Sequence, residues 1–200
     1  MSKYNNYTKF INLSKCYIDK EILTMEMIKT IAMRKSTRSY KAEQISDESL
    51  NIILNAGCAA PVGMGAYNTV HLTVIQNPDL LDKITKATAN VFGNPNMKPF
   101  YGAPTLVIIS GKPNEKAPNA EIANAACIIE NMTLVATDIG LGSVYLWGFL
   151  ASFNADEELL KELNLPKGFV PASAIALGYP TEPLTKEKEL KPTITINTIK

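Results

Sequence analysis

Arg34, Ser36 and Arg38 are the residues of this 200-residue chain whose types and spacing first suggest a binding chemistry. Side chains alternate between the two faces of an extended chain, so these three would point the same way. Two guanidinium groups with forked, permanently charged donors, together with one hydroxyl donor, suit a phosphate group. The sequence therefore predicts an anion site at 34–38, and the alternative interpretation is a solvated basic turn.

A second candidate is the glycine-rich stretch that contains Gly140, Gly142, Trp147 and Gly148. It differs from the dinucleotide fingerprint, which opens a helix and needs a third glycine where this chain has Tyr145. Because glycine lacks a Cβ, the backbone at these positions could run close to a flat ligand. The alternative is purely structural, with a helix that ends at Gly140 and a core strand after it.

Three further segments could present polar groups to such a ligand. Proline, glycine and asparagine make residues 61–68 a loop, in which Asn68 could offer its amide to the edge of a heterocycle. The others are the loop around Asn94, Asn96 and Lys98 and the C-terminal lysines Lys186 and Lys188. For each of them the alternative is an ordinary turn or a solvated charged surface.

Composition and charge disfavour several other classes of protein. Twenty Lys and Arg against nineteen Asp and Glu give a net charge of +1, which does not support nucleic-acid binding or a polybasic membrane surface. The three cysteines lie far apart and the only histidine is His71, so neither a disulfide framework nor a metal site is indicated. Cys127, in a helix predicted to be buried, is interpreted as a small hydrophobic residue.

No segment has the pattern of an export signal or of a membrane helix. The N-terminus interleaves lysines with apolar residues, and the charge-free stretch 139–155 is shorter than the about 20 residues that a membrane helix needs. We therefore expect a cytoplasmic protein that binds neither nucleic acid nor membrane. Residues 1–24 are expected to form an N-terminal extension, and residues 25–200 one domain.

Helices must position these groups. Helix-start signals are found near Thr24, at Ser46 and at Asn77, where Pro78 follows. The third helix is expected to run to about residue 90, and a short helix is expected at about 155–163. The longest helical pattern, at about 119–139, is apolar nearly all round, so we expect it to be buried or at a subunit interface.

Apolar and β-branched runs predict strands at 69–76, 105–110 and 172–179. The run 105–110 is apolar on both alternating faces, which predicts a central strand covered on both sides. Strands that are separated by helices indicate a layered protein of mixed α/β content.

The order and spacing of these features resemble the FMN-dependent nitroreductase family over about residues 25–200. The segments that carry the resemblance are RKSTR at 34–38, CAAP at 58–61, TVHLTVIQ at 69–76, NPNMKPFYGAP at 94–104, IGLGSVYLWGF at 139–149 and LNLPKGFVPASAIALGYP at 163–180. The resemblance implies an α+β fold, a nitroreductase-like α/β sandwich with a central mixed or antiparallel sheet flanked by helices. It also implies an intertwined homodimer with FMN at the interface.

The resemblance also implies roles for individual residues. Arg34 and Ser36 match residues that hold the FMN phosphate and ribityl chain, and Arg38 matches a cation near the pyrimidine edge of the flavin. The Gly148 backbone, with Trp147, matches the approach to flavin N5. The remaining cofactor contacts that it implies are Lys186 and Lys188 at the phosphate, Asn94, Asn96 or Lys98 at the ribityl chain or pyrimidine, and Pro61, Val62, Gly63 and Asn68 from the partner subunit. No catalytic side chain and no metal are implied.

The chain departs from the family pattern at three places. Val62 follows Pro61 where serine is common, and Val70 and Leu72 stand where the family commonly has glutamine and tryptophan. Trp147 stands where an acidic residue is common. The partner-subunit contacts and the substrate preference are therefore not carried over from the resemblance.

The implied activity is that of an NAD(P)H-dependent flavin oxidoreductase, with NADH or NADPH as reductant. It would reduce nitro compounds, quinones or a related small electron acceptor by ping-pong hydride transfer through flavin N5. Two alternatives stay open. One is a divergent reaction on the same fold, such as dehalogenation, enone reduction or flavin breakdown, and the other is a non-catalytic flavin carrier or electron-transfer protein.

Overall fold

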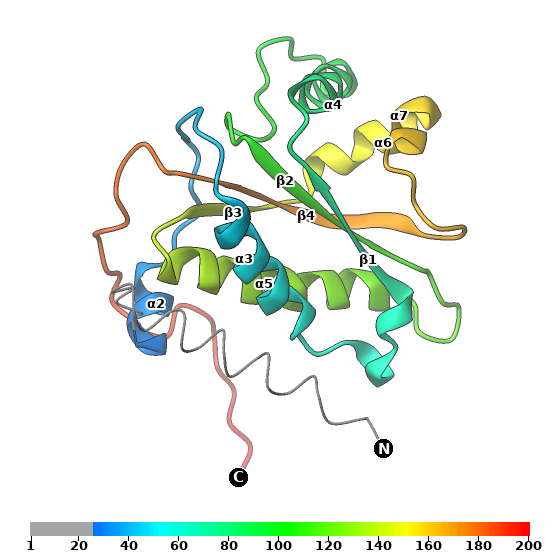
Figure 1. The fold of residues 1–200 in the computed structure, drawn as a ribbon. Helices are drawn as coiled ribbons and strands as arrows, with labels where there is room; N and C mark the ends of the chain where they lie inside the picture. The colour runs from blue at the N-terminus through cyan, green and yellow to red at the C-terminus, as the bar shows by residue number, and fades with distance from the viewer. Residues whose placement is uncertain (1–25) are drawn as a thin grey trace, which may run out of the picture.

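A four-stranded sheet lies at the centre of the computed structural model, which describes residues 26–200 (Figure 1). Its strands are β1 (Val70–Ile75), β2 (Thr105–Gly111), β3 (Gly142–Leu146) and β4 (Val170–Gly178). They lie in the order β1-β2-β4-β3, and every neighbouring pair is antiparallel. The α+β sheet expected from the sequence is thus confirmed in its antiparallel form, and β2 is central and buried along its whole length.

The outer edge of β3 is paired with the segment that follows the first described helix. The backbone N–H of Thr37 donates to the Ser143 carbonyl oxygen at 2.8 Å, and Ser36 forms a parallel bridge with Ser143. A few residues later, the N–H of Lys41 donates to the Tyr179 carbonyl oxygen at 2.8 Å. Residues 36–41 therefore run along the sheet edge, as the extended-chain prediction for 34–38 requires.

Helices cover both faces of the sheet. On one face α3 (Asp47–Cys58) and α5 (Ala120–Asp138) pack against alternate side chains of β2 and β4. On the other face lie α4 (Pro78–Val91), α6 (Ala151–Ala155) and α7 (Glu157–Glu162). In Figure 1, α5 runs below the sheet with α3 in front of it, and α4 lies above. The short helix α2 (Met27–Met33) packs against α5.

Two helix starts that the sequence predicted, those of α3 and α4, are capped by side chains as expected. The N–H of Ser49 donates to Ser46 Oγ at 3.2 Å, and the N–H of Leu80 donates to Asn77 Oδ1 at 3.0 Å. Thr24, the expected start of the first helix, lies outside the described residues. The short helix expected at about 155–163 is confirmed as α7, which Asp156 caps by accepting the N–H of Leu159 at 2.9 Å, whereas the helix α6 directly before it was not predicted.

The helix α5 corrects one expectation about Cys127. Its inner side chains, among them Ile129 and Met132, are buried, but Ala126 and Cys127 are exposed. The interpretation of Cys127 as a buried hydrophobic residue is therefore wrong for the single chain. The reason is that α5 packs against the sheet and α3 on its inner side, whereas the described part of the chain supplies no layer over its outer side.

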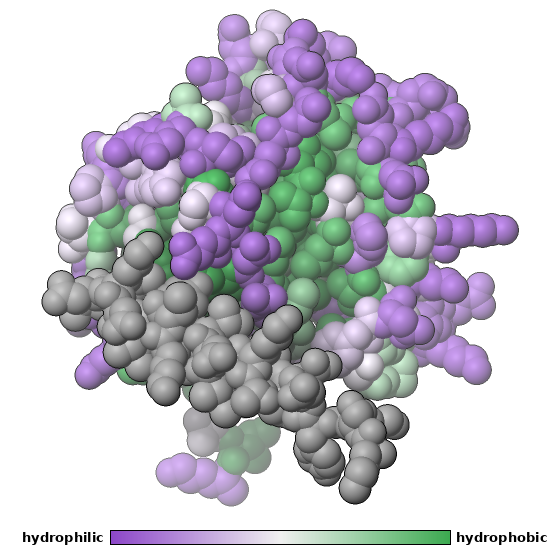
Figure 2. All heavy atoms as spheres, in the orientation of Figure 1, coloured by the Kyte–Doolittle hydropathy of each residue, from purple (hydrophilic) through white to green (hydrophobic). Residues whose placement is uncertain are grey.

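Large apolar side chains remain on the surface of one chain. Figure 2, in the same view as Figure 1, shows hydrophobic side chains across the middle of the molecule, beneath the hydrophilic surface of α4. The exposed ones include Met27, Ile28, Met64, Tyr67, Val74 and Trp147. Exposed apolar surface of this kind is typical of a binding or subunit interface. Among the described helices, none is long and apolar enough to cross a membrane.

Candidate functional site

The segment 34–38 joins the first described helix to the edge of the sheet. Thr37 is buried and packs so closely on Gly142 that a Cβ there would lie 2.7 Å from Thr37 Cγ2. Ser36 on one side of it is half-buried, and Arg38 on the other is exposed. Thr37 therefore anchors the segment to the sheet, while Ser36 and Arg38 line a surface recess of about 400 Å³ to which both neighbours of each also contribute, and Arg34 is not part of its lining.

The C-terminal tail brings a lysine to this segment. The backbone N–H of Lys188 donates to the Ala32 carbonyl oxygen at 3.0 Å, and its Nζ donates to the Arg34 carbonyl oxygen at 3.1 Å. Lys188 is exposed overall, but partial desolvation first, and the neighbouring Arg34 second, lower its pKa, while Glu130 opposes the shift. Two cations thus lie close together, which is a suitable arrangement for an anion. Lys186 lies two residues earlier in the same tail and is exposed.

Tyr101 orients Arg38. The guanidinium carbon of Arg38 lies 5.9 Å from the centre of the Tyr101 ring, within the range of a cation–π interaction. Tyr101 occupies the left-handed region with φ 56°, and Gly102 follows with φ 82°. This tight turn places the ring beside Arg38. Beneath it, the buried Tyr40 hydroxyl donates to the Thr37 carbonyl oxygen at 3.0 Å, and burial raises the pKa of Tyr40.

The turn after β3 exposes Trp147 and Gly148 above a row of aromatic rings. Trp147 is 52% exposed, whereas Phe149 is buried, with its ring centre 5.3 Å from that of Phe100. A Cβ at Gly148 would lie 3.8 Å from Cζ of Phe92. The glycine backbone is therefore open to the surface at the point where the loop after α4 approaches it.

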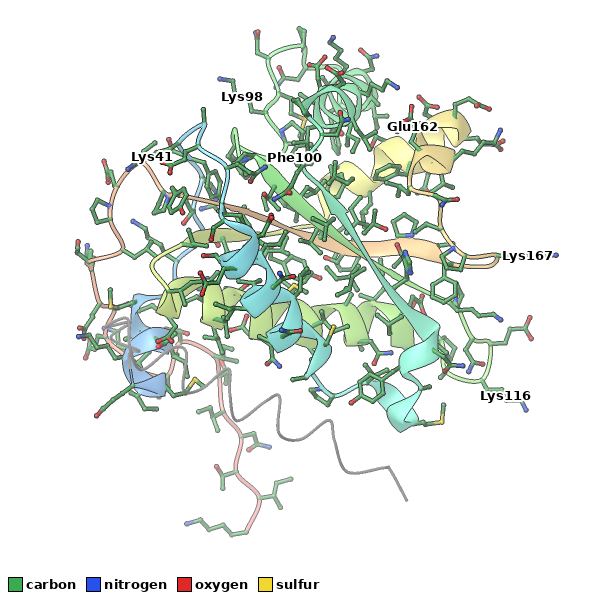
Figure 3. The ribbon with its side chains drawn as sticks, in the orientation of Figure 1. Lys41, Lys98, Phe100, Lys116, Glu162 and Lys167 are labelled. Carbon is green, nitrogen blue, oxygen red and sulfur yellow. The ribbon has the colours of Figure 1, made fainter. Side chains whose placement is uncertain are left out.

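The loop 92–104 carries Asn94, Asn96 and Lys98. The N–H of Asn96 donates to Asn94 Oδ1 at 3.1 Å, so the Asn94 side chain stabilises the turn of the loop itself. In Figure 3, Lys98 lies on the outer part of the loop and Phe100 lies nearer the sheet. Phe100 thus anchors the loop, and Asn96 and Lys98 remain exposed for a ligand.

The structure does not bring residues 61–68 to Arg34 within one chain. Val62 packs in the core, and the N–H of Gly63 donates to Asn124 Oδ1 at 3.0 Å, near the start of α5. The helix that precedes Arg34 meets the other end of α5, where Thr30 Oγ1 donates to Asp138 at 3.3 Å. Asn124 and Asp138 are separated by about 21 Å along α5, given the rise per residue of a helix.

Within one chain, the predicted site residues of the loop 61–68 therefore lie apart from those of the segment 34–38. The side chain of Val62 is committed to the core, so only its backbone is available to a ligand, whereas Pro61, Gly63 and Asn68 are exposed.

Sequence reasoning missed several residues of the site. Thr37 Oγ1 and Ser143 Oγ are buried hydroxyls without a hydrogen-bond partner among the described residues, and they sit on the two paired backbones. Tyr101 was quoted only as part of a loop. An aromatic residue directly before a glycine, in the loop before a predicted strand, was the available signal for Tyr101. The hydroxyls carry no such signal, because their juxtaposition depends on the edge pairing of 36–37 with 143.

Comparisons with known proteins agree with this geometry. The model of the nitroreductase family matches residues 31–179. A curated Archaeoglobus fulgidus protein, provisionally named NADH dehydrogenase/NAD(P)H nitroreductase, is 31% identical over 78% of this chain and 87% of its own length. The Bacillus subtilis protein FMN reductase [NAD(P)H] is 25% identical over 82% of this chain and 70% of its own. A Bacteroides fragilis nitroreductase crystallised with bound FMN superposes with a TM-score of 0.72, at 35% identity, over 88% of this chain and 100% of that one.

Proposed function

The chain belongs to the nitroreductase family, and on this premise we propose that it is an FMN-dependent oxidoreductase that uses NADH or NADPH. Its electron acceptors would be nitro compounds, quinones or related small molecules. The observation that carries the proposal is the meeting of Lys188 with Arg34, next to Ser36 and Arg38, on one edge of the sheet. The FMN bound to the Bacteroides fragilis nitroreductase supports the identity of the cofactor.

The residues at this edge fit the phosphate end of FMN. Arg34 and Lys188 repel one another, and this repulsion contributes to the lowered pKa of Lys188. A phosphate that carries nearly two negative charges would relieve the repulsion and accept hydrogen bonds from both side chains. Ser36 adds a neutral donor on the same segment. We therefore assign Arg34, Ser36 and Lys188 to the phosphate and ribityl chain, with Lys186, Asn96 and Lys98 as additional candidates.

Arg38 and the Trp147–Gly148 turn fit the ring system. Arg38, held by the ring of Tyr101, would place a positive charge beside the pyrimidine edge and stabilise negative charge there. The open backbone at Gly148 allows a flat ring to approach closely. When bound, FMN supplies the chemistry, taking a hydride from NADH or NADPH and passing electrons to the acceptor in a second half-reaction. The chain itself binds and orients, and no side chain needs to move a proton.

A second copy of the chain would complete the site. The loop that carries Pro61, Gly63 and Asn68 lies at the far end of α5 from Arg34, so it cannot serve the same site in one chain. Exposed apolar residues and the uncovered outer side of α5 are suited to burial in a homodimer. We propose that this loop, including the backbone of Val62, contacts the flavin of the partner subunit.

Steady-state kinetics test the proposed reaction. The FMN-loaded protein should oxidise NADH or NADPH in the presence of 1,4-benzoquinone or a nitrofuran, with parallel double-reciprocal lines because reductant and acceptor react in turn. If FMN is bound but neither nucleotide supports turnover, the protein is a flavin carrier and the proposal of catalysis is wrong. Intersecting lines would contradict the ping-pong order alone.

A further inference from the structure

A cavity of about 370 Å³ lies beside Trp147, away from the proposed phosphate site. The first turn of α5, the helices α6 and α7 and the start of β4 form its walls, and in Figure 1 these elements lie toward the right-hand side. Its lining includes Glu121, Ile122, Trp147, Phe153, Leu160 and Val170. Glu121 is separated from Asp138, the end of α5 near Arg34, by about 25 Å along the helix. The cavity is thus separate from the proposed phosphate site and borders the proposed ring site at Trp147.

Glu121 is the acidic residue of this cavity. Its Oε2 is buried without a hydrogen-bond partner, and it forms no ion pair with any residue in the described range 26–200. Close packing fixes its position, because its Cα lies only 3.2 Å from where a Cβ at Gly111 would be. Oε2 itself has almost no accessible surface, but Glu121 is only partly buried and lines the cavity, so its negative charge would stabilise a positively charged donor bound there.

The lysine next to Gly111 does not supply that donor. Cε of Lys112 lies 3.7 Å from where a Cβ at Gly168 would be, so its side chain is directed along the neighbouring loop. No hydrogen bond or ion pair joins Lys112 to Glu121 in the part of the chain that the structure describes. The charge of Glu121 is therefore left for something other than this lysine.

The other walls of the cavity suit an apolar body that carries such a charge. Trp147 is half-exposed at the rim, and the face of an indole ring attracts cations more strongly than any other side-chain ring. Ile122, Leu160 and the buried Phe153 provide an apolar floor. A carboxylate and an indole ring that line the same apolar cavity are suited to bind an organic cation. The volume suffices for one or two rings.

We propose that this cavity binds a small organic cation with an apolar body, such as an arylalkylammonium ion. Its ammonium group would lie on the Glu121 carboxylate and its body against Trp147. The cavity shares Trp147 with the proposed flavin ring site and no residue with the proposed phosphate site, and binding of the cation needs no step of the proposed reaction.

A charge series of one molecular shape tests the proposal on the full-length protein as purified. The probes are 4-methylbenzylammonium, 4-methylbenzyl alcohol and 4-methylbenzoate, and calorimetry measures their affinities. Trp147 is the only tryptophan of the chain, so a change in tryptophan fluorescence reports binding at this cavity. The ammonium probe should bind at least about tenfold more tightly than the other two, because charge-assisted hydrogen bonds are the stronger ones.

Two variants locate the effect. Glu121→Gln keeps the shape of the side chain and should reduce the preference for the ammonium probe to about twofold or less. The control Glu115→Gln removes a charge from the exposed loop before α5 and should leave this preference unchanged. Val170→Phe narrows the rim and should weaken all three probes, which keeps the test decisive if Glu121→Gln does not fold. Equal binding of the three probes, no binding, or a preference that survives in Glu121→Gln would overturn the proposal. The visible absorbance of FMN in the same samples separately tests the flavin assignment.

Discussion

Lys188 Nζ donates a hydrogen bond to the carbonyl oxygen of Arg34 at 3.1 Å, although the two residues are 154 positions apart. The tail therefore returns to the first described helix, and the N–H of Lys188 fixes it there by donating to Ala32. The proposed phosphate site is built from the two ends of the domain. The affinity of this site for FMN should therefore depend on both the segment 34–38 and the C-terminal tail.

Replacement of Lys188 by methionine should weaken FMN binding on the order of tenfold, because a charge-assisted hydrogen bond is lost. The wild-type affinity should also fall as the pH rises through the alkaline range below the ordinary lysine value of 10.5. The reason is that burial and Arg34 lower the pKa of Lys188 in the free protein, whereas a bound phosphate would retain the proton. Binding then takes up a proton and weakens with rising pH. Flavin fluorescence titrations of the apoprotein measure both effects.

The matched control is Lys191→Met, which removes a lysine of the same tail that is paired with Glu189 on the surface. It should change the affinity for FMN by less than about twofold, since exposed ion pairs contribute little. Equal losses in the two variants would contradict a specific role for Lys188, as would a pH slope that persists in Lys188→Met.

Replacement of Arg38 by glutamine should lower the midpoint potential of bound FMN by about 30 mV, which corresponds to a tenfold change for a two-electron couple. The positive charge favours the reduced, more negative flavin, and Tyr101→Leu should give a smaller shift in the same direction because the guanidinium loses its ring. Spectroelectrochemistry measures the potential. Lys41→Gln, an exposed lysine nearby, should leave it unchanged; a potential that Arg38→Gln does not alter would exclude the proposed position of Arg38.

Replacement of Gly142 by alanine should lower the free energy of unfolding by about 1–3 kcal/mol through overpacking. The new Cβ would lie 2.7 Å from Thr37 Cγ2 and would push the segment 34–41 off the edge of β3. The double variant Gly142→Ala/Thr37→Ala should recover part of the loss, because it removes the clashing methyl and hydroxyl groups. Urea unfolding is the measurement, and an unchanged midpoint in Gly142→Ala would show that this contact is not close.

A mixture of two inactive variants tests whether the Pro61 loop acts on the partner subunit. Arg34→Glu reverses a charge at the proposed phosphate site and damages one site in its own chain, and Gly63→Glu places a charge on the exposed loop. If the loop acts in trans, a mixed dimer contains one site free of both changes and the mixture should recover about a quarter of the wild-type activity, as random pairing makes half of the dimers mixed. No recovery after subunit exchange, with exchange verified by mass, would place the loop outside the site.

The sequence predicted the elements that depend on local signals. Ser46 and Asn77 were recognised as helix caps because capping chemistry is local, and β2 was recognised as central because both of its faces are apolar. The short helix α7 was recognised within its expected range, but α6 directly before it was not predicted, since five residues give little helical periodicity. The outward direction of Cys127 could not be predicted, because a helix that is apolar nearly all round does not indicate which side packs inward.

The candidate site was predictable as a set of residue types and not as a geometry. Arg34, Ser36 and Arg38 share one extended segment, and the alternation of such a chain predicts a common face; Ser36 and Arg38 line one recess, and Arg34 lies outside it beside the tail. The approach of Lys188 to Arg34 and of Tyr101 to Arg38 depends on the path of a tail and of a loop. Such long-range pairings leave no periodic signal in the sequence.

The visible absorption spectrum of the purified protein, recorded anaerobically before and after addition of NADH and then NADPH, tests the central claim most directly. The account predicts flavin bands that bleach on addition of at least one nucleotide, and that are lost on gel filtration more readily from Lys188→Met than from Lys191→Met. A protein that shows no flavin bands and takes up no FMN on incubation would contradict the assignment of Arg34, Ser36, Arg38 and Lys188 as a flavin site.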